Sequence, residues 1–113
     1  METAGLGSFA VAAAPAVVSW MGGSLNEILQ NTERMSEITR TTHKYFTIPF
    51  LEGRGSPVGI DIRKVVRTGI TPTINTGVAH KEAGIGQVGA GQAVTPIEVF
   101  KQALKAYAQK YGL

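Results

Sequence analysis

Residues 75 to 91 hold the groups most suited to binding a small anion. The stretch reads NTGVAHKEAGIGQVGAG and contains five glycines. Glycine loses more conformational freedom on folding than any other residue, so this richness needs a reason for a bare backbone. Backbone N–H groups freed by glycines can form a concave nest for a phosphate or a carboxylate. The alternative, equally open on the sequence, is that these glycines only make turns and let two pieces of backbone pack closely.

The candidate anion site combines bare amides with side-chain donors, and a helix starting near Thr95 could add its positive dipole end. No catalytic residue is predicted. The predicted site residues are Arg63, Asn75, Thr76, His80, Lys81, Gly84, Gly86, Gln87, Gly89 and Gly91.

The same glycines also match a dinucleotide-binding fingerprint, G-x-G-x-x-G, at Gly84, Gly86 and Gly89. That motif must open directly into a helix that holds the pyrophosphate. Here the residues AGQAVTP intervene, and the remaining residues read as one helix with no second strand. The sequence therefore predicts no nicotinamide cofactor and no other cofactor.

A metal site is also disfavoured. His80 and Glu82 would share a face of an extended chain, but a third ligand is not visible, because His43 lies in a different segment. A hydrogen-bonded structural role is the better prediction for His80. The chain has no cysteine, which excludes disulfides and thiolate catalysis.

The elements that must position these residues indicate an α+β fold with three to four helices and a small sheet of short strands. A βαβ-like crossover through residues 45 to 78 is the alternative. Capping signals at Ser8, Ser24 with Glu27, Asp61 and Thr95 start the helices, and Pro15 should bend or split the first one. The predicted helices are 9–21, 24–44, 60–70 and 95–113; the predicted strands are 45–50 and 71–80, with a loop at 51–57.

Composition indicates one domain or domain fragment, residues 1 to 113, with a globular balance of 43% hydrophobic and 17% charged residues. The net charge of +3 is spread along the chain, which argues against nucleic-acid binding. The apolar stretch 9–21 is shorter than the roughly 18 residues needed to cross a bilayer, and the first residues lack a signal peptide's positive start. We therefore expect a cytoplasmic protein. Trp20 and Tyr107 are expected to belong to the core.

Three stretches carry a resemblance to a known family: GLGSFAVAAAPAVVSWMGG, GIDIRKVVRTGITPTINTGVAHKEAGIGQVGAG and TPIEVFKQALKAYAQKYG. Together they resemble the C-terminal part of the large YlbE-like bacterial proteins. Some members of that family are similar to oxamate carbamoyltransferase subunits, which are associated with FdrA-like proteins in purine and allantoin nitrogen breakdown. The resemblance implies a multi-subunit enzyme acting on small anions that carry phosphate or carboxylate groups.

Family members are several times longer than this chain. The resemblance therefore implies the C-terminal portion of a larger architecture: a truncated or split product, or a chain that needs an N-terminal or FdrA-like partner or forms a homo-oligomer. The very apolar first helix fits this expectation, since it would need a covering partner. The competing interpretation is a non-catalytic assembly module whose Gly- and Ala-rich segments pack against other chains.

Overall fold

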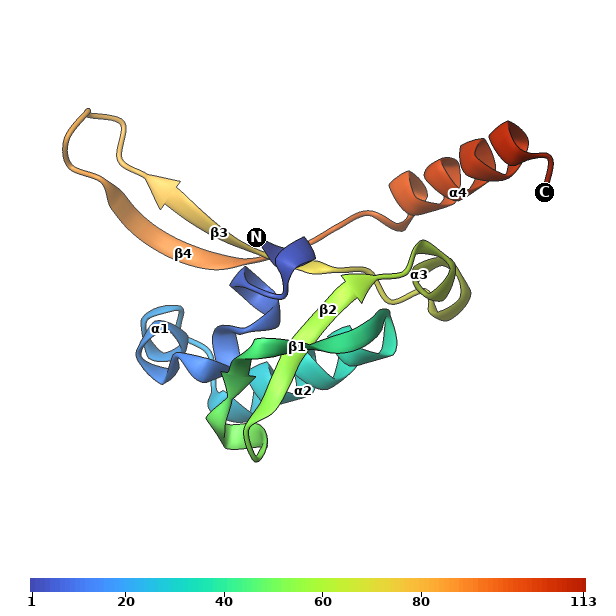
Figure 1. Cartoon of the computed structure of the whole chain (residues 1–113). Coiled ribbons are helices and arrows are strands. Elements are labelled where there is room, and N and C mark those ends of the chain that lie inside the picture. The colour runs from blue at the N-terminus through green and yellow to red at the C-terminus, as the bar shows by residue number, and fades with distance from the viewer.

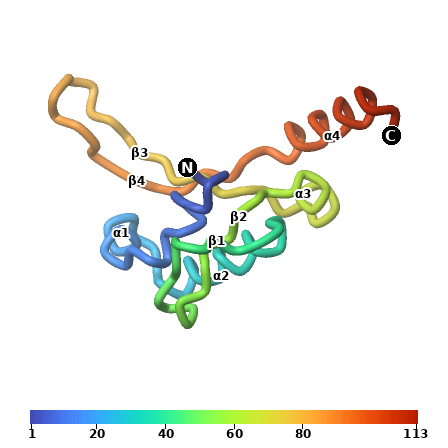
Figure 2. The backbone as a smooth tube through the Cα atoms, in the orientation of Figure 1, coloured from blue at the N-terminus to red at the C-terminus, as the bar shows by residue number.

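The computed structural model describes all 113 residues and has an α+β fold, as predicted, with four α-helices and two antiparallel two-stranded sheets. A body formed by residues 1–71 carries two arms, a β-hairpin and the C-terminal helix α4. The arms extend in different directions from the point where they leave the body (Figure 1). The backbone trace shows the same divergence (Figure 2). The predicted small sheet is therefore two separate sheets.

The N-terminal segment differs from the continuous helix predicted over 9–21. It consists of three short 3-10 turns, η1 (Glu2–Ala4), η2 (Gly7–Phe9) and η3 (Val11–Ala13), followed by helix α1 (Pro15–Trp20). Proline lacks a backbone N–H and fits the first turn of a helix, so Pro15 starts α1 and splits the segment, one of the two outcomes predicted for it. Ser8 caps no helix, because its buried hydroxyl bonds to Thr73.

Helix α2 (Leu25–Glu37) begins with the predicted capping box. The Glu27 amide donates to Ser24 Oγ at 3.2 Å, and the Ser24 amide donates to Glu27 Oε2 at 2.9 Å. The helix ends well before residue 44, because the β-branched run that begins at Thr39 forms a strand instead.

The first sheet pairs β1 (Thr39–Ile48) with β2 (Arg54–Ile60) in antiparallel order, so the βαβ-like crossover does not form. A 3-10 turn, η4 (Pro49–Leu51), joins the strands, and the predicted loop 51–57 is therefore mostly strand. The register shifts between Thr42 and Thr47. Across this irregular stretch the backbone of His43 approaches Gly55 too closely for a side chain at that position.

Helix α3 (Ile62–Thr68) has both predicted ends. Asp61 caps it, with Oδ1 accepting a 2.9 Å hydrogen bond from the Arg63 amide. Gly69 ends it with φ of 72°, a left-handed conformation that glycine adopts without steric cost.

The hairpin pairs β3 (Thr73–Ala79) with β4 (Gln87–Val94). Strand β3 was predicted, whereas β4 was not. Glycine is disfavoured in strand interiors, so the GAG run at 89–91 gives this segment a low strand propensity, and no strand was predicted there. The chain after Gly89 therefore contains a strand before its last helix, contrary to the one-helix interpretation.

Helix α4 (Ile97–Tyr111) was predicted, but its start is different. The hydroxyl of Thr95 donates to the Pro72 carbonyl at 2.8 Å, and Pro96 occupies the capping position without a side-chain bond. Ile97 and Phe100 anchor the helix against a core cluster. No residue of α4 is fully buried.

The core consists of two small clusters in the body. One contains Val11, Ala12, Val18, Ile28 and Ile48, and the other contains Phe9, Met35, Ile38 and Val65. The radius of gyration, 15.7 Å, exceeds the roughly 13 Å of a compact chain of this length, because the arms add extent without core. None of the helices is long and apolar enough to pass through a membrane.

Candidate functional site

A hollow of about 310 Å³ lies between helix α1 and the hairpin. It collects four of the predicted site residues from β3 and β4. Asn75 and Gln87 line it together with Trp20, a composition that suits a small polar ligand. The residues around it are Val17, Trp20, Met21, Asn75, Thr76, Gly77, Gln87, Ala90 and Gly91.

A hydrogen-bonded network fixes the body end of the hairpin. The hydroxyls of Ser8 and Thr73 lie 2.6 Å apart, and Gln92 Nε2 donates to Ser8 Oγ at 2.7 Å. Asn31 Nδ2 on α2 donates to Thr73 Oγ1 at 3.1 Å, and Gln92 Nε2 also reaches Asn75 Oδ1 at 3.4 Å. The body thus holds the base of both hairpin strands through side chains.

Glu2 adds a bond at the edge of β3. Its Oε1 accepts the Asn75 amide at 3.0 Å and the Ser8 amide at 3.2 Å. Burial raises the pKa of the Glu2 carboxyl, but the hydrogen bonds from the Asn75, Ser8 and Glu2 amides, together with the charge of the N-terminus, outweigh burial and lower the pKa. The carboxylate therefore stays ionised and satisfies a donor on the exposed edge of the strand.

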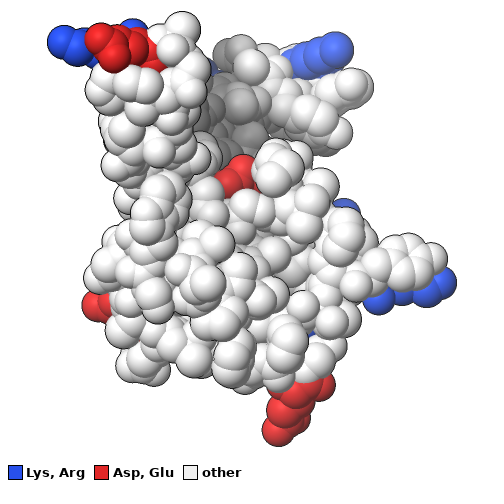
Figure 3. All heavy atoms as spheres, turned by 90° about the vertical axis from the view of Figure 1, so that its left-hand side faces the viewer, with Lys and Arg blue, Asp and Glu red and all other residues white.

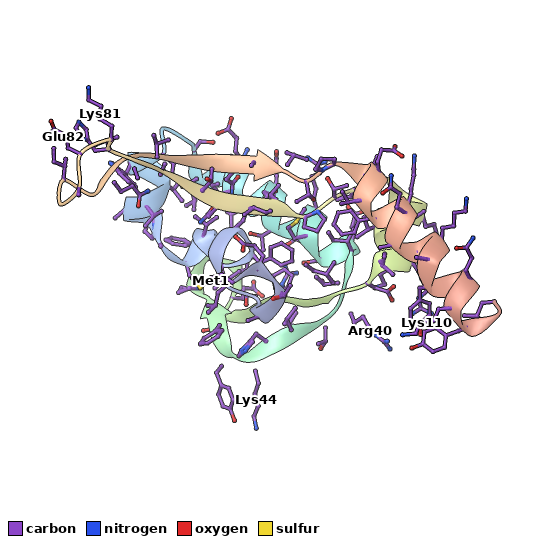
Figure 4. All side chains as sticks on the ribbon, turned by 90° about the horizontal axis from the view of Figure 1, so that it is seen from above. Met1, Arg40, Lys44, Lys81, Glu82 and Lys110 are labelled. Carbon is purple, nitrogen blue, oxygen red and sulfur yellow. The ribbon has the colours of Figure 1, made fainter.

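The tip of the hairpin holds four further predicted residues, away from the hollow. Gly84 and Gly86 have φ of 90° and 87°, so a turn requires them. The His80 amide donates to the Gly86 carbonyl at 2.8 Å, and His80 Nδ1 accepts the Glu82 amide at 3.0 Å. His80 thus has the hydrogen-bonded structural role predicted for it. Lys81 and Glu82 project from this end of the arm (Figure 4).

The three remaining glycines of the stretch lie within the strands of the hairpin and not in its turn. Gly77 leaves room for the side-chain amide of Gln87, whose Nε2 would lie 2.5 Å from an added Cβ. Gly89 and Gly91 pair with Val78 and Thr76 in the ladder. Directly paired residues share a face of a sheet, so these glycines form a row of bare backbone beside β-branched side chains.

We call this surface the outer face of the hairpin. Alternation places it opposite Thr73, Asn75 and Gln92, whose side chains bond toward the body. It consists of Ile74, Thr76 and Val78 on β3 and Gly89, Gly91 and Ala93 on β4.

Arg63 lies apart from the other predicted residues. It belongs to α3, on the opposite side of the body from the hairpin tip (Figure 1). Its guanidinium pairs with Asp61 at 2.8 Å instead of with any group on the hairpin. The structure thus distributes the predicted site over the hollow, the hairpin tip and α3.

Trp20 is the residue at the hollow that sequence reasoning assigned wrongly. It was expected in the core, and 56% of it is exposed. Tyr107, also expected in the core, is 54% exposed. An aromatic residue on an apolar helix gives no signal of exposure until the neighbouring elements are placed. No group of three or more His, Cys, Asp or Glu side chains in the structure could hold a metal ion.

Comparisons with known proteins identify relatives of this chain. No family model matches it, so the YlbE-like assignment stays a prediction. Oxamate carbamoyltransferase subunit AllG of Escherichia coli K12 is 47% identical over 113 residues, which are 99% of this chain and 27% of AllG. The uncharacterised E. coli K12 protein YahG is 43% identical over 112 residues, covering 99% of this chain and 24% of YahG.

A solved structure shows the same fold. The crystal structure of a conserved protein of unknown function from Enterococcus faecalis V583 matches with a TM-score of 0.83 and 51% identity, over 93% of this chain and 25% of that chain. The chain therefore spans about a quarter of the length of the relatives it matches. The expected similarity to an oxamate carbamoyltransferase subunit is confirmed for that quarter.

Proposed function

We propose that this chain is part of a carbamoyltransferase-type subunit and that its hairpin packs against another part of the assembly. The 47% identity to AllG supports the first part. Following the resemblance to the YlbE-like family, the complex serves purine or allantoin nitrogen breakdown, and an FdrA-like chain is a candidate partner. The observation that carries the packing role is the outer face of the hairpin.

The outer face is apolar and incompletely covered. Val78 is 59% exposed and Ile74 is 38% exposed, while Gly91 has open space where its side chain would be. A two-stranded hairpin is marginally stable in water unless another surface covers it, so this arm gains stability by packing.

The charge distribution supports the same role. The view of the molecule from the hairpin side shows a broad surface without charged side chains on the arm and on the body below it, with an acidic group near the middle and the other charged groups at the margins (Figure 3). Contacting cores of protein interfaces are depleted of charged residues in this way. Polypeptide corresponding to the remaining three-quarters of the relatives is the occupant we favour, and a second copy of this chain is the alternative.

Sedimentation velocity tests the packing role. The wild-type chain is measured alone and mixed with the part of AllG that lies outside the aligned segment, together with Val78→Lys and a control, Thr41→Lys, on the exposed surface of β1. We expect a complex with the wild type and Thr41→Lys that Val78→Lys weakens at least about tenfold, the effect of a charge placed in an apolar contact. Equal behaviour of all three would contradict the proposal.

A second function is carried by the hollow beside α1, which would hold the small phosphate- or carboxylate-bearing anion expected from the sequence. The side-chain amides of Asn75 and Gln87 supply donors there. Aligned donors of this kind stabilise negative charge that develops during acyl or carbamoyl transfer.

Amide-resolved NMR titration with phosphate, oxamate and carbamoyl phosphate tests this site. Saturable shifts at Asn75, Gln87 and Gly91 are expected, and Gln87→Ala should weaken them. If the shifts were confined to the hairpin tip, or if there were none, the hollow would not be the anion site.

A further inference from the structure

The largest pocket of the molecule lies between α3 and the second half of α4, on the side of the body away from the hollow. Its volume is about 620 Å³, within the roughly 300–1,000 Å³ range of small-molecule sites. Ile60, Ile62, Leu104 and Ala108 give it apolar walls. Its polar groups come from three separate elements and are Arg40, Asp61, Arg63 and Tyr107.

The guanidinium of Arg63 is held in a fixed position at this pocket. Arg63 Nε donates to Asp61 Oδ1 at 3.1 Å, and Arg63 Nη2 donates to Asp61 Oδ2 at 2.8 Å. The side-chain hydrogen bond from Arg63 is the main reason that the pKa of Asp61 lies well below its usual range. Asp61 therefore stays ionised and orients one edge of the guanidinium, which leaves the other N–H groups of Arg63 for a ligand.

Arg40 carries the uncompensated charge of the pocket. It lies near the start of β1, and none of the ion pairs of the structure involves it. Asp61 is the one acidic side chain that lines the pocket and is already paired with Arg63. Two arginines and one aspartate leave a formal side-chain charge of +1, and Leu113, the last residue, also lines the pocket. Lys64 and Arg67 on α3 line an adjoining pocket with Asp61 and Arg63, so the surroundings are also basic.

Tyr107 gives the pocket an aromatic wall. Its ring lies 4.6 Å from that of Tyr111, one turn further along α4. A planar apolar group could stack on the exposed ring while its charge reaches the arginines.

We propose that this pocket binds an organic monocarboxylate with a flat apolar body. The carboxylate lies between the guanidinium groups of Arg40 and Arg63, and the body lies against Tyr107 and Leu104. Arginine suits this role because its planar fork of donors matches the geometry of a carboxylate. The inference does not rest on the packing role of the hairpin or on the anion site at the hollow.

NMR titration of the whole chain with three probes tests the proposal. Benzoate has both required features, benzamide lacks the charge, and acetate lacks the apolar body. We expect saturable shifts at the amides of Arg63 and Ala108 with benzoate, at least about tenfold weaker binding of the other two, and no shifts at Gly89 and Gly91. No saturable binding of benzoate, or equal binding of benzoate and benzamide, would overturn the proposal.

Variants then separate the named side chains. Arg40→Gln should weaken benzoate binding about tenfold without affecting folding, because Arg40 is exposed and forms no ion pair. Tyr107→Ala should weaken benzoate binding by a smaller factor than Arg40→Gln does. Tyr107→Phe keeps the aromatic ring and should therefore bind benzoate more tightly than Tyr107→Ala. Arg54→Gln is the matched control, since Arg54 is exposed and pairs with Glu33 outside this pocket. An Arg40→Gln variant that binds benzoate like Arg54→Gln would also overturn the proposal.

Discussion

The hydroxyls of Ser8 and Thr73 lie 2.6 Å apart, a buried hydrogen bond between residues 65 positions apart in the chain. It joins the N-terminal segment to the first residue of β3. Gln92 and Asn31 extend this bond to β4 and to α2. The projecting hairpin therefore has a rigid base, and its orientation is set by polar contacts instead of by a hydrophobic core.

Removing the Ser8 hydroxyl should loosen this base. Ser8→Ala leaves Gln92 Nε2 and Thr73 without their shared partner in a buried place, which should cost about 1–3 kcal/mol of unfolding free energy. Urea denaturation measures the cost, and hydrogen exchange at Asn75 and Gln92 should accelerate. Ser19→Ala, at an exposed position, should change stability by less than about 0.5 kcal/mol. Equal costs for the two variants would refute the network's role.

Acid should destabilise the chain through Glu2. The pKa of Glu2 is lower in the folded chain than its ordinary value, because the effect of burial is outweighed by the hydrogen bonds from the Asn75, Ser8 and Glu2 amides together with the charge of the N-terminus. A depressed folded pKa contributes stability that is fully present above the unfolded value, roughly 4.3 for glutamate, and is lost as the pH falls through the folded value.

Thermal unfolding across this acidic range measures the contribution. Glu2→Gln should be less stable than the wild type at neutral pH, and the difference should shrink as the pH falls below about 4. Glu98→Gln is the control, since Glu98 is exposed and forms its ion pair with Lys101 on its own helix. A difference that stays constant with pH would show that the Glu2 carboxylate gains nothing from these amides.

Two glycines that both lie in strands, Gly55 in β2 and Gly91 in β4, should differ in how much stability they lose on replacement by alanine. At Gly55 a Cβ would overlap the backbone carbonyl of His43, whereas at Gly91 it would meet nothing within 4 Å. Gly55→Ala should therefore lower the free energy of unfolding by about 1–3 kcal/mol or more, as overpacking does. Gly91→Ala should leave it nearly unchanged. Chemical denaturation of both variants checks this, and a neutral Gly55→Ala would show that β1 shifts freely at its irregular stretch.

Local signals predicted the parts of the fold that local chemistry decides. The capping box at Ser24, the Asp61 cap and the Gly69 stop are each set by residues within one turn of the helix end, and all are confirmed. The prediction of one continuous helix over 9–21 was wrong, because proline begins a helix more readily than it continues one and Pro15 begins α1. Strand β4 was missed because pairing with β3, which no local pattern encodes, overrides the low strand propensity of its glycines.

The candidate site shows the same limit. Asn75, Thr76, Gln87 and Gly91 do meet at one hollow, because hairpin pairing brings their strands together. Arg63 was assigned to them on charge alone and lies on another side of the body, where the fold places it beside Asp61. Trp20 and Tyr107 were expected in the core, and their exposure follows from the arrangement of α1 and α4, which only tertiary contacts determine.

Hydrogen–deuterium exchange of the hairpin tests the packing role most directly. The chain is measured alone and in the presence of the part of AllG outside the aligned segment. The account predicts that amides of residues 76–79 and 88–93 exchange markedly more slowly in the mixture, while those of α2 are unchanged. The packing role would be contradicted if the hairpin amides exchanged at the same rate alone and in the mixture, whether or not other amides exchanged more slowly.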